Sequence, residues 1–360
     1  MRKAIIYFIS LLASYFISEP SIANNKLNEL FSPPVFVCPP CAHVDDVFKT
    51  KHYKHDGQCP VCGMNLIELY APSCPSSDFH MGSGNVCFKS QRGTNIPIFY
   101  HIPKSFSAGT KVLLVLPGAG RNAWRYRDTW IQASEKYNVM ILSPHYSEKQ
   151  YPEFWSYNLA NMISDVTINP SRTAIDSYKI VQNDKQWIFS DFDRIFDLAV
   201  NKLNLTAKSY DMFGHSAGGQ ILHRYAIFAN HSKANRILSS NSGWYTVTTD
   251  AAPFPYGLNG LTHDATQLSK SLKKKLVLFL GELDDDNETR GHLVRNAELD
   301  VQGTNRVDRG KYFYQQAKQY AKKSDLQYDW KLHIVEGIGH DYVNMGKAAA
   351  RYLYHNDRED

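Results

Sequence analysis

A serine stands at the apex of the pattern Gly214-His215-Ser216-Ala217-Gly218. The pattern follows a short stretch that reads as a strand, 209–213, and precedes a helical stretch, 219–227. A serine hydroxyl is a poor nucleophile unless its oxygen projects from the backbone and a base removes its proton. Flanking glycines let a strand turn sharply into a helix and present the serine. The pattern therefore predicts a nucleophile at Ser216, with a purely structural turn as the alternative.

A nucleophilic serine requires a histidine base and an acid that orients it. Of the fourteen histidines, His340 follows a late strand within the glycine-rich turn Gly337-Ile338-Gly339. His333 lies inside that strand and is interpreted as a packed wall residue, whereas His215 adjoins the serine and leaves the turn in another direction. We therefore expect His340 to be the base. The acid is one of three consecutive aspartates, 284–286, which follow another strand.

The elements that position these residues are buried strands. Continuous apolar runs are typical of parallel strands covered on both faces, and they occur at 111–116, 139–143 and 275–280. A further strand is expected at 329–335. A helical stretch, 124–137, separates the first two. Serine, aspartate and histidine each follow the carboxyl end of a strand, in the chain order of an α/β-hydrolase. The sequence predicts an α/β fold with a mostly parallel sheet flanked by helices.

Residues from about 90 to 355 resemble an α/β-hydrolase of the esterase and polyhydroxybutyrate-depolymerase-like branch. The resemblance rests on Gly281-x-x-Asp284, Gln302-Gly303-x-x-Arg306 and the closing Gly339-His340. It implies that Asp284, rather than Asp285 or Asp286, is the acid. It also implies an oxyanion hole formed by the backbone N–H groups of Ala119 and Ala217. In the family the oxyanion loop usually begins with His-Gly, whereas here it begins with Pro117-Gly118, so the loop geometry is expected to differ.

The expected function is that of an exported serine hydrolase that cleaves a small or polymeric carboxylic ester through a Ser216–His340–Asp284 triad and an acyl-enzyme. No catalytic cofactor is expected. A peptidase or amidase on the same fold is one alternative. A periplasmic metal-handling protein that uses the hydrolase body as a scaffold is another. Aromatic residues in two insertions, 146–187 and 241–256, are expected either to line the substrate pocket or to cover the edge of the sheet.

The beginning of the chain reads as a secretory signal peptide, residues 1–23. Arg2 and Lys3 precede an apolar core, 4–16, and Ser21-Ile22-Ala23 is a small-residue cleavage site. The core is too short to span a bilayer comfortably. We therefore expect a periplasmic or secreted protein without stable membrane insertion.

A cysteine-rich module, residues 24–70, is predicted to bind a metal ion. Cys38 and Cys41 form one C-x2-C pair, and Cys59 and Cys62 form a second. Four thiolates at this spacing suit a tetrahedral structural zinc ion, and metal would supply the folding energy of so short a segment. Residues 55–66 resemble the heavy-metal-binding domain of copper-efflux adaptors and transport ATPases. Two disulfides, or copper(I) with Met64 nearby, are the alternatives.

A linker, residues 71–89, is expected between this module and the hydrolase domain, 90–360. Cys74 and Cys87 lie within it, and an exported protein seldom leaves such a pair of thiols free. A disulfide between them is predicted, with two buried unpaired cysteines as the alternative.

The charge of the chain does not indicate a nucleic-acid partner. The net charge is +5. Loss of two positive charges (Arg2, Lys3) and one negative charge (Glu19) with the signal leaves +4, spread along the chain. The run Lys273-Lys274-Lys275 lies at a predicted helix end, where cations suit the helix dipole. Nucleic-acid binding is therefore not expected.

Overall fold

A computed structural model describes residues 35–38, 52–60, 66–68, 74, 78–171, 173–261 and 265–355. The predicted signal peptide lies outside these residues. So do Cys41 and Cys62, two of the four predicted metal ligands.

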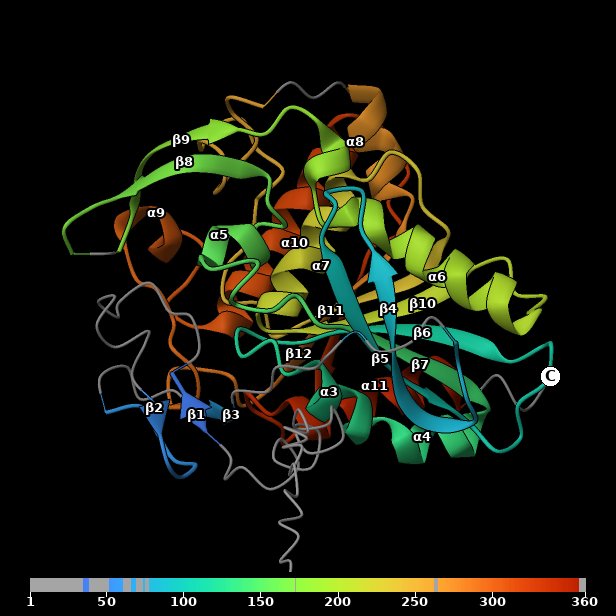
Figure 1. The fold of residues 1–360 in the computed structure, drawn as a ribbon. Coiled ribbons are helices and arrows are strands. Elements are labelled where there is room, and N and C mark those ends of the chain that lie inside the picture. The colour runs from blue at the N-terminus through green and yellow to red at the C-terminus, as the bar shows by residue number, and fades with distance from the viewer. Residues whose placement is uncertain are drawn as a thin grey trace, which may run out of the picture.

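An eight-stranded sheet forms the centre of the molecule (Figure 1). The strands lie in the order β13-β12-β11-β10-β6-β7-β5-β4. Their bounds are β4 Gly82–Lys89, β5 Asn95–Ile102, β6 Lys111–Leu116, β7 Val139–Pro144, β10 Tyr210–His215, β11 Ala234–Ser240, β12 Lys275–Gly281 and β13 Lys331–Val335. The six strands from β13 to β7 pair in parallel, whereas β5 and β4 are antiparallel. The predicted α/β fold is confirmed.

Helices cover both faces of the sheet, which is why the parallel strands read as continuous apolar runs. On one face lie α3 (Ala123–Thr129), α4 (Ile131–Tyr137) and α11 (Tyr342–Tyr354). On the other lie α6 (Phe189–Leu203), α7 (Ala217–Phe228), α8 (Ala265–Leu272) and α10 (Arg306–Lys323). Each face has its own buried core, centred on residues such as Phe213 and Trp130 on the first and Tyr225 and Phe313 on the second.

Two predicted boundaries differ from the structure. The predicted helix at 124–137 is two helices that meet at Trp130, whose buried indole packs against Phe213 of the sheet. Strand β4 lies within the segment predicted as linker, and it pairs along its whole length with β5. The sheet therefore begins at Gly82, ahead of residue 90. A strand whose residues alternate between buried and partly exposed gives a weaker sequence signal than the buried central strands.

The insertion between β7 and α6 contains a short helix, α5 (Phe154–Tyr157), and a separate two-stranded sheet. Its strands, β8 (Ile163–Ile168) and β9 (Ile175–Ile180), pair antiparallel. A 3-10 turn, Asp184–Gln186, leads from this hairpin into α6. Figure 1 shows the hairpin projecting beyond the central sheet, on the side of α5 and of a further short helix, α9 (Ala297–Asp300).

The N-terminal part contains a small antiparallel sheet in the order β2-β1-β3. Its strands are β1 Phe36–Val37, β2 His52–Tyr53 and β3 Ile67–Glu68. Cys38, directly after β1, and Cys59 are both buried. The predicted Cys74–Cys87 disulfide is present, with the two Cα atoms 4.9 Å apart, and it ties the segment before β4 to that strand.

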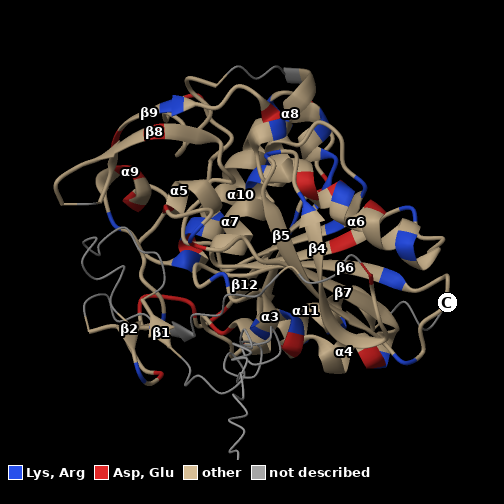
Figure 2. Cartoon of the chain, viewed as in Figure 1, with Lys and Arg blue, Asp and Glu red and all other residues tan. Residues whose placement is uncertain are grey.

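Figure 2 shows basic and acidic residues interspersed, for example along α6. In the described part of the chain, no helix combines the length and the apolar character that spanning a bilayer requires.

Candidate active site

Ser216 occupies a strained turn between β10 and α7. Its backbone has φ 56° and ψ −114°, a region that non-glycine residues rarely adopt. The backbone N–H of Ser216 donates to the carbonyl oxygen of Ser240 at 2.9 Å, which joins the turn to the end of β11. A Cβ atom at Gly218 would collide with the backbone of Pro117, so only glycine lets α7 start this close to the end of β6. The local sequence therefore forms a tight turn at Ser216 between a strand and a helix.

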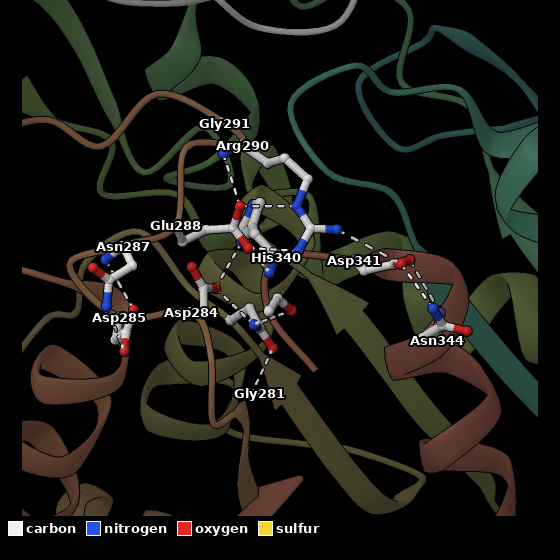
Figure 3. Close-up of polar contacts among 12 residues, drawn as sticks. Gly281, Asp284, Asp285, Asn287, Glu288, Arg290, Gly291, His340, Asp341 and Asn344 are labelled. Carbon is white, nitrogen blue, oxygen red and sulfur yellow. Dashed lines mark hydrogen bonds and ion pairs between the residues drawn. The ribbon is translucent and has the colours of Figure 1, made fainter. Parts of the chain in front are cut away.

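His340 and Asp284 lie in contact at the ends of β13 and β12. The distance from Nδ1 of His340 to Oδ2 of Asp284 is 2.7 Å (Figure 3). The two turns are joined by a backbone hydrogen bond from Leu283 to the carbonyl oxygen of Ile338, 3.0 Å long. Asp284 is buried, with 1% of its surface exposed. The structure thus brings together the base and the acid that the sequence suggested.

The neighbouring aspartates make other contacts. Asp285 accepts a hydrogen bond from the backbone of Asn287 at 2.9 Å. Asp286 is exposed and accepts from the hydroxyl of Thr304 at 2.9 Å. Of the three aspartates, Asp284 is therefore the one that contacts His340.

Two further side chains hold Asp284. Asn241 donates from Nδ2 to Oδ2 of the carboxylate at 2.6 Å, and Arg306 donates from Nη1 to Oδ1 at 3.0 Å. Burial by itself raises the pKa of Asp284, but the proximity of His340, and after it Arg306 and Asn241, holds that pKa well below its usual range. The carboxylate is thus ionised and fixed in orientation.

Sequence reasoning did not assign these two residues a role in the site. Arg306 is the last residue of the motif Gln302-Gly303-x-x-Arg306, which the sequence analysis had singled out. The motif alone does not indicate that Arg306 binds Asp284. Asn241 directly follows β11, at the carboxyl ends of the strands where the candidate triad also lies. That position in the sequence could have marked it as a candidate.

The surroundings of His340 lower the pKa of its imidazole. Burial lowers its pKa and the nearby Arg306 guanidinium lowers it further, while Asp284 partly opposes both effects. His215 lies beside it, with ring centroids 4.6 Å apart, and burial lowers the pKa of His215 well below its usual value. His333, in contrast, stacks on Phe279 at 5.0 Å within the sheet wall, as predicted.

A pocket opens beside Ser216, and Ala119 and Ala217 both line it. The loop after β6 passes close to the serine, since the Cβ position at Gly118 lies 3.4 Å from Cβ of Ser216. The hydroxyl of Tyr157 donates to the carbonyl oxygen of Pro117 at 2.8 Å and fixes this loop. The two residues predicted to form the oxyanion hole therefore border the same pocket as the predicted nucleophile.

The remaining walls come from the insertions and from the segment after β12. The first insertion contributes Phe154 and the end of the β8–β9 hairpin, and the second contributes Trp244 and Tyr256. Asn296 donates to the carbonyl oxygen of Thr173 at 2.7 Å and holds the hairpin in place. Other aromatic residues of the first insertion, Tyr151 and Tyr157, are buried in the core. Aromatic residues of both insertions thus line the pocket, which is one of the two roles expected of them.

The segment after β12 carries Gly291 to the His340 side of the pocket. A Cβ atom at Gly291 would lie 3.2 Å from Nε2 of His340, and Gly291 lines the same pocket as Ser216. Nε2 of His340 therefore lies close to a residue that lines the same pocket as Ser216.

A mostly parallel sheet, a sharp turn bearing a serine, and a histidine–aspartate pair at the next strand ends define the α/β-hydrolase class. Poly(aspartic acid) hydrolase-1 from Sphingomonas sp. KT-1 is 30% identical, with a TM-score of 0.69 over 76% of this chain and 98% of that one. LpqC, a poly(3-hydroxybutyrate) depolymerase from Bordetella parapertussis, is 24% identical, with a TM-score of 0.68 over 77% of this chain and 91% of that one. No protein-family model and no curated protein matches the sequence.

The chain belongs to the α/β-hydrolase family that includes this poly(aspartic acid) hydrolase, and it is a hydrolase.

Proposed function

We propose that the protein is an exported serine hydrolase that cleaves a carboxylic ester through a Ser216–His340–Asp284 triad. The observation that carries the proposal is the 2.7 Å contact between His340 and Asp284, at the border of the pocket that Ser216 lines. A buried, ionised carboxylate at Nδ1 fixes the tautomer in which Nε2 is free to accept a proton. The lowered pKa of His340 keeps that nitrogen unprotonated near neutral pH.

The reaction would follow two steps. Oγ of Ser216 attacks the ester carbonyl carbon while Nε2 of His340 takes the hydroxyl proton, and the N–H groups of Ala119 and Ala217 stabilise the oxyanion. The tetrahedral adduct expels the alcohol, which receives the proton from His340, and leaves an acyl-Ser216 ester. Water then attacks this ester with His340 again acting as base, and the acid product and free Ser216 are released.

An amide substrate is the second candidate, and one observation favours it. The relative at 30% identity is named for hydrolysis of poly(aspartic acid), a polymer linked by amide bonds, whereas LpqC is named for a polyester. An alkoxide is a better leaving group than an amine, so a triad that cleaves amides also cleaves matched esters. Esterase and amidase activity can be distinguished by comparing the turnover of a p-nitrophenyl ester and a p-nitroanilide that carry the same acyl group.

The test of the proposal is covalent labelling followed by this comparison. A fluorophosphonate probe should modify the protein once, and peptide mass mapping should place the adduct on Ser216. The p-nitrophenyl ester should be hydrolysed and the matched p-nitroanilide should react far more slowly. Label on another residue would overturn the assignment of the nucleophile. Equal turnover of the anilide would replace the esterase by an amidase.

The N-terminal module is proposed to hold a structural zinc ion through Cys38, Cys41, Cys59 and Cys62. The described half of this donor set fits zinc, because Cys38 and Cys59 are both buried, each with 2% of its surface exposed, in a small three-stranded module. Such a short segment has little apolar core of its own, so a metal would stabilise it. Copper(I) bound by the same thiolates, or two disulfides, are the alternatives that metal analysis separates.

Export is proposed on the signal-like N-terminus. The Cys74–Cys87 disulfide supports it, because disulfides persist mainly in oxidising compartments. N-terminal sequencing of the protein recovered from its producing cells should begin at Asn24. A metal-handling role for the whole chain would instead require that the hydrolase body be inactive toward every ester and unreactive with the fluorophosphonate.

A further inference from the structure

Helix α7 carries an arginine whose charge is buried. Arg224 is 0% exposed. Its Nε donates to the hydroxyl of Thr246 at 2.9 Å, and its Nη1 donates to the carbonyl oxygens of Asn158 at 3.1 Å and Gln220 at 3.0 Å. The guanidinium lies over the ring of Trp244, with Cζ 4.4 Å from the centroid. All of these partners are neutral.

The charge of Arg224 is not balanced within the described residues. No described carboxylate forms an ion pair with it, and its Nη2 has no hydrogen-bond partner among those residues. Two other buried arginines do contact carboxylates, Arg306 at Asp284 and Arg309 at Asp300. Burial lowers the pKa of Arg224 well below its usual value, because a cation in this setting lacks both water and a counter-ion.

This unbalanced charge lies directly behind the wall of the pocket. Asn158, Gln220 and Trp244, which surround the guanidinium, all line the pocket that contains Ser216. Gln220 and Arg224 lie four residues apart on α7, and Ser216 stands four residues before Gln220, at the N-cap of the helix. Arginine side chains on a helix lean toward its N-terminus. The charge is therefore directed along α7 toward the nucleophile.

Gln220 is placed to transmit this charge to a ligand. Its Oε1 lies 3.5 Å from Nη1 of Arg224. Its Nε2 lies on the side of Gly243, 3.1 Å from the Cβ position there, and Gly243 also lines the pocket. An amide whose oxygen faces a guanidinium presents its NH₂ group as a donor polarised by that cation.

We propose that the pocket selects substrates whose acyl part carries a carboxylate, bound by Nε2 of Gln220 with Arg224 as the counter-charge. This inference rests on the proposed esterase function and names the substrate class of the same site. Gln220 lies about 6 Å along the helix axis from Ser216. The carboxylate should therefore stand a few carbon atoms from the scissile carbonyl, as in the monoesters of glutaric or adipic acid.

The experiment compares charged and neutral acyl groups of the same shape. The full-length protein is assayed with p-nitrophenyl hydrogen glutarate and with p-nitrophenyl 5-methylhexanoate, in which an isopropyl group replaces the carboxylate. The measured quantity is the ratio of the two kcat/KM values. Because the attraction between a carboxylate and an unbalanced buried guanidinium is large compared with thermal energy even across Gln220, the ratio should exceed about 10 for the wild type.

Gln220→Glu supplies the sharpest variant, because it gives Arg224 a counter-ion with almost no change in side-chain size. The ratio of the two kcat/KM values should fall to about 1 or below, because the introduced carboxylate then balances Arg224 and repels the carboxylate of the substrate. Gln132→Glu, the same change at an exposed position of α4, is the matched control and should keep the wild-type ratio.

Each outcome decides the matter. A ratio above about 10 that collapses in Gln220→Glu and persists in Gln132→Glu supports the inference. A wild-type ratio near 1, with brisk turnover of the neutral ester, overturns the inference and leaves the esterase function standing; Arg224 would then only tie α7 to α5 and Thr246. Failure to hydrolyse either ester, with no fluorophosphonate adduct, overturns both.

Discussion

Glu288 accepts a hydrogen bond of 2.6 Å, through Oε2, from the backbone N–H of His340. The same carboxylate binds Arg290, whose Nη2 also lies 2.6 Å from Oε2, and Arg290 reaches Asp341 at 3.7 Å on the other side of the histidine (Figure 3). Burial raises the pKa of Glu288, but its hydrogen bonds with Arg290 and His340 outweigh this and lower the pKa to about 2. An anionic side chain thus fixes the loop that carries the proposed base.

Two changes at Glu288 should separate its charge from its hydrogen bond. The negative charge of Glu288 raises the pKa of His340. Glu288→Gln keeps an acceptor for the N–H of His340 and should move the acid limb of the kcat/KM profile to lower pH. Glu288→Ala releases the loop and should lower kcat by about tenfold, because a displaced base loses its alignment with the serine. Wild-type pH profiles in both variants, together with an unchanged kcat in Glu288→Ala, would show that Glu288 neither tunes nor positions His340.

The pH dependence of the wild type should follow the protonation of His340. Burial and the Arg306 charge lower its pKa below the ordinary value of 6.5, and catalysis requires the unprotonated ring. Activity should therefore be constant near neutral pH and should fall as pH drops through an apparent pKa below 6.5. A profile of kcat/KM against pH checks this, and an acid limb centred above pH 7 would contradict it.

Removal of the Arg306 charge should shift the acid limb of the kcat/KM profile to higher pH. Arg306→Gln takes away a cation that disfavours protonated His340, so the acid limb should move to higher pH. Arg351→Gln, at an exposed position of α11, removes the same charge away from the site and should leave the limb in place. An unshifted limb in Arg306→Gln would mean that the guanidinium does not set the pKa of the base.

The three aspartates should differ sharply when each is replaced by asparagine. Asp284→Asn should lower kcat on the order of 10³–10⁴-fold, because the wrong tautomer of the base is then favoured. Asp285→Asn and Asp286→Asn should remain near the wild type, since these carboxylates contact Asn287 and Thr304 instead of His340. Steady-state kinetics with one p-nitrophenyl ester measures all three. A crippled Asp285→Asn or Asp286→Asn variant would refute the assignment of the acid.

The sequence predicted the central fold and the candidate triad for a physical reason. Buried parallel strands require continuous apolar runs, and the turns that follow them carry the polar residues 216, 284 and 340 at one edge of the sheet. Asn241 and Glu288 escaped prediction because their importance lies in contacts across the fold, not in any local pattern. Arg224 escaped for the same reason, since an arginine in a helix is usually exposed.

The proposed metal module makes its own prediction. The intact protein should contain about one zinc ion per chain, and Cys38→Ser should release it, because a tetrahedral site needs all four ligands. Elemental analysis measures this directly, and Cys74→Ser serves as a control outside the proposed ligand set. Since zinc would be structural, its removal should not abolish ester turnover. A metal-free protein without free thiols, apart from the Cys74–Cys87 bridge, would show that the four cysteines form disulfides.

The most direct test of the central claim is the turnover of Ser216→Ala. A second serine offers a matched control: Oγ of Ser83 lies 2.7 Å from Nδ1 of His101, whose Nε2 lies 2.9 Å from Glu135, but Ser83 is exposed on the edge strand β4. Ser216→Ala should remain folded and lose ester hydrolysis on the order of 10⁴-fold or more, with loss of the fluorophosphonate adduct. Ser83→Ala should keep both. Near-normal turnover in Ser216→Ala would contradict the account.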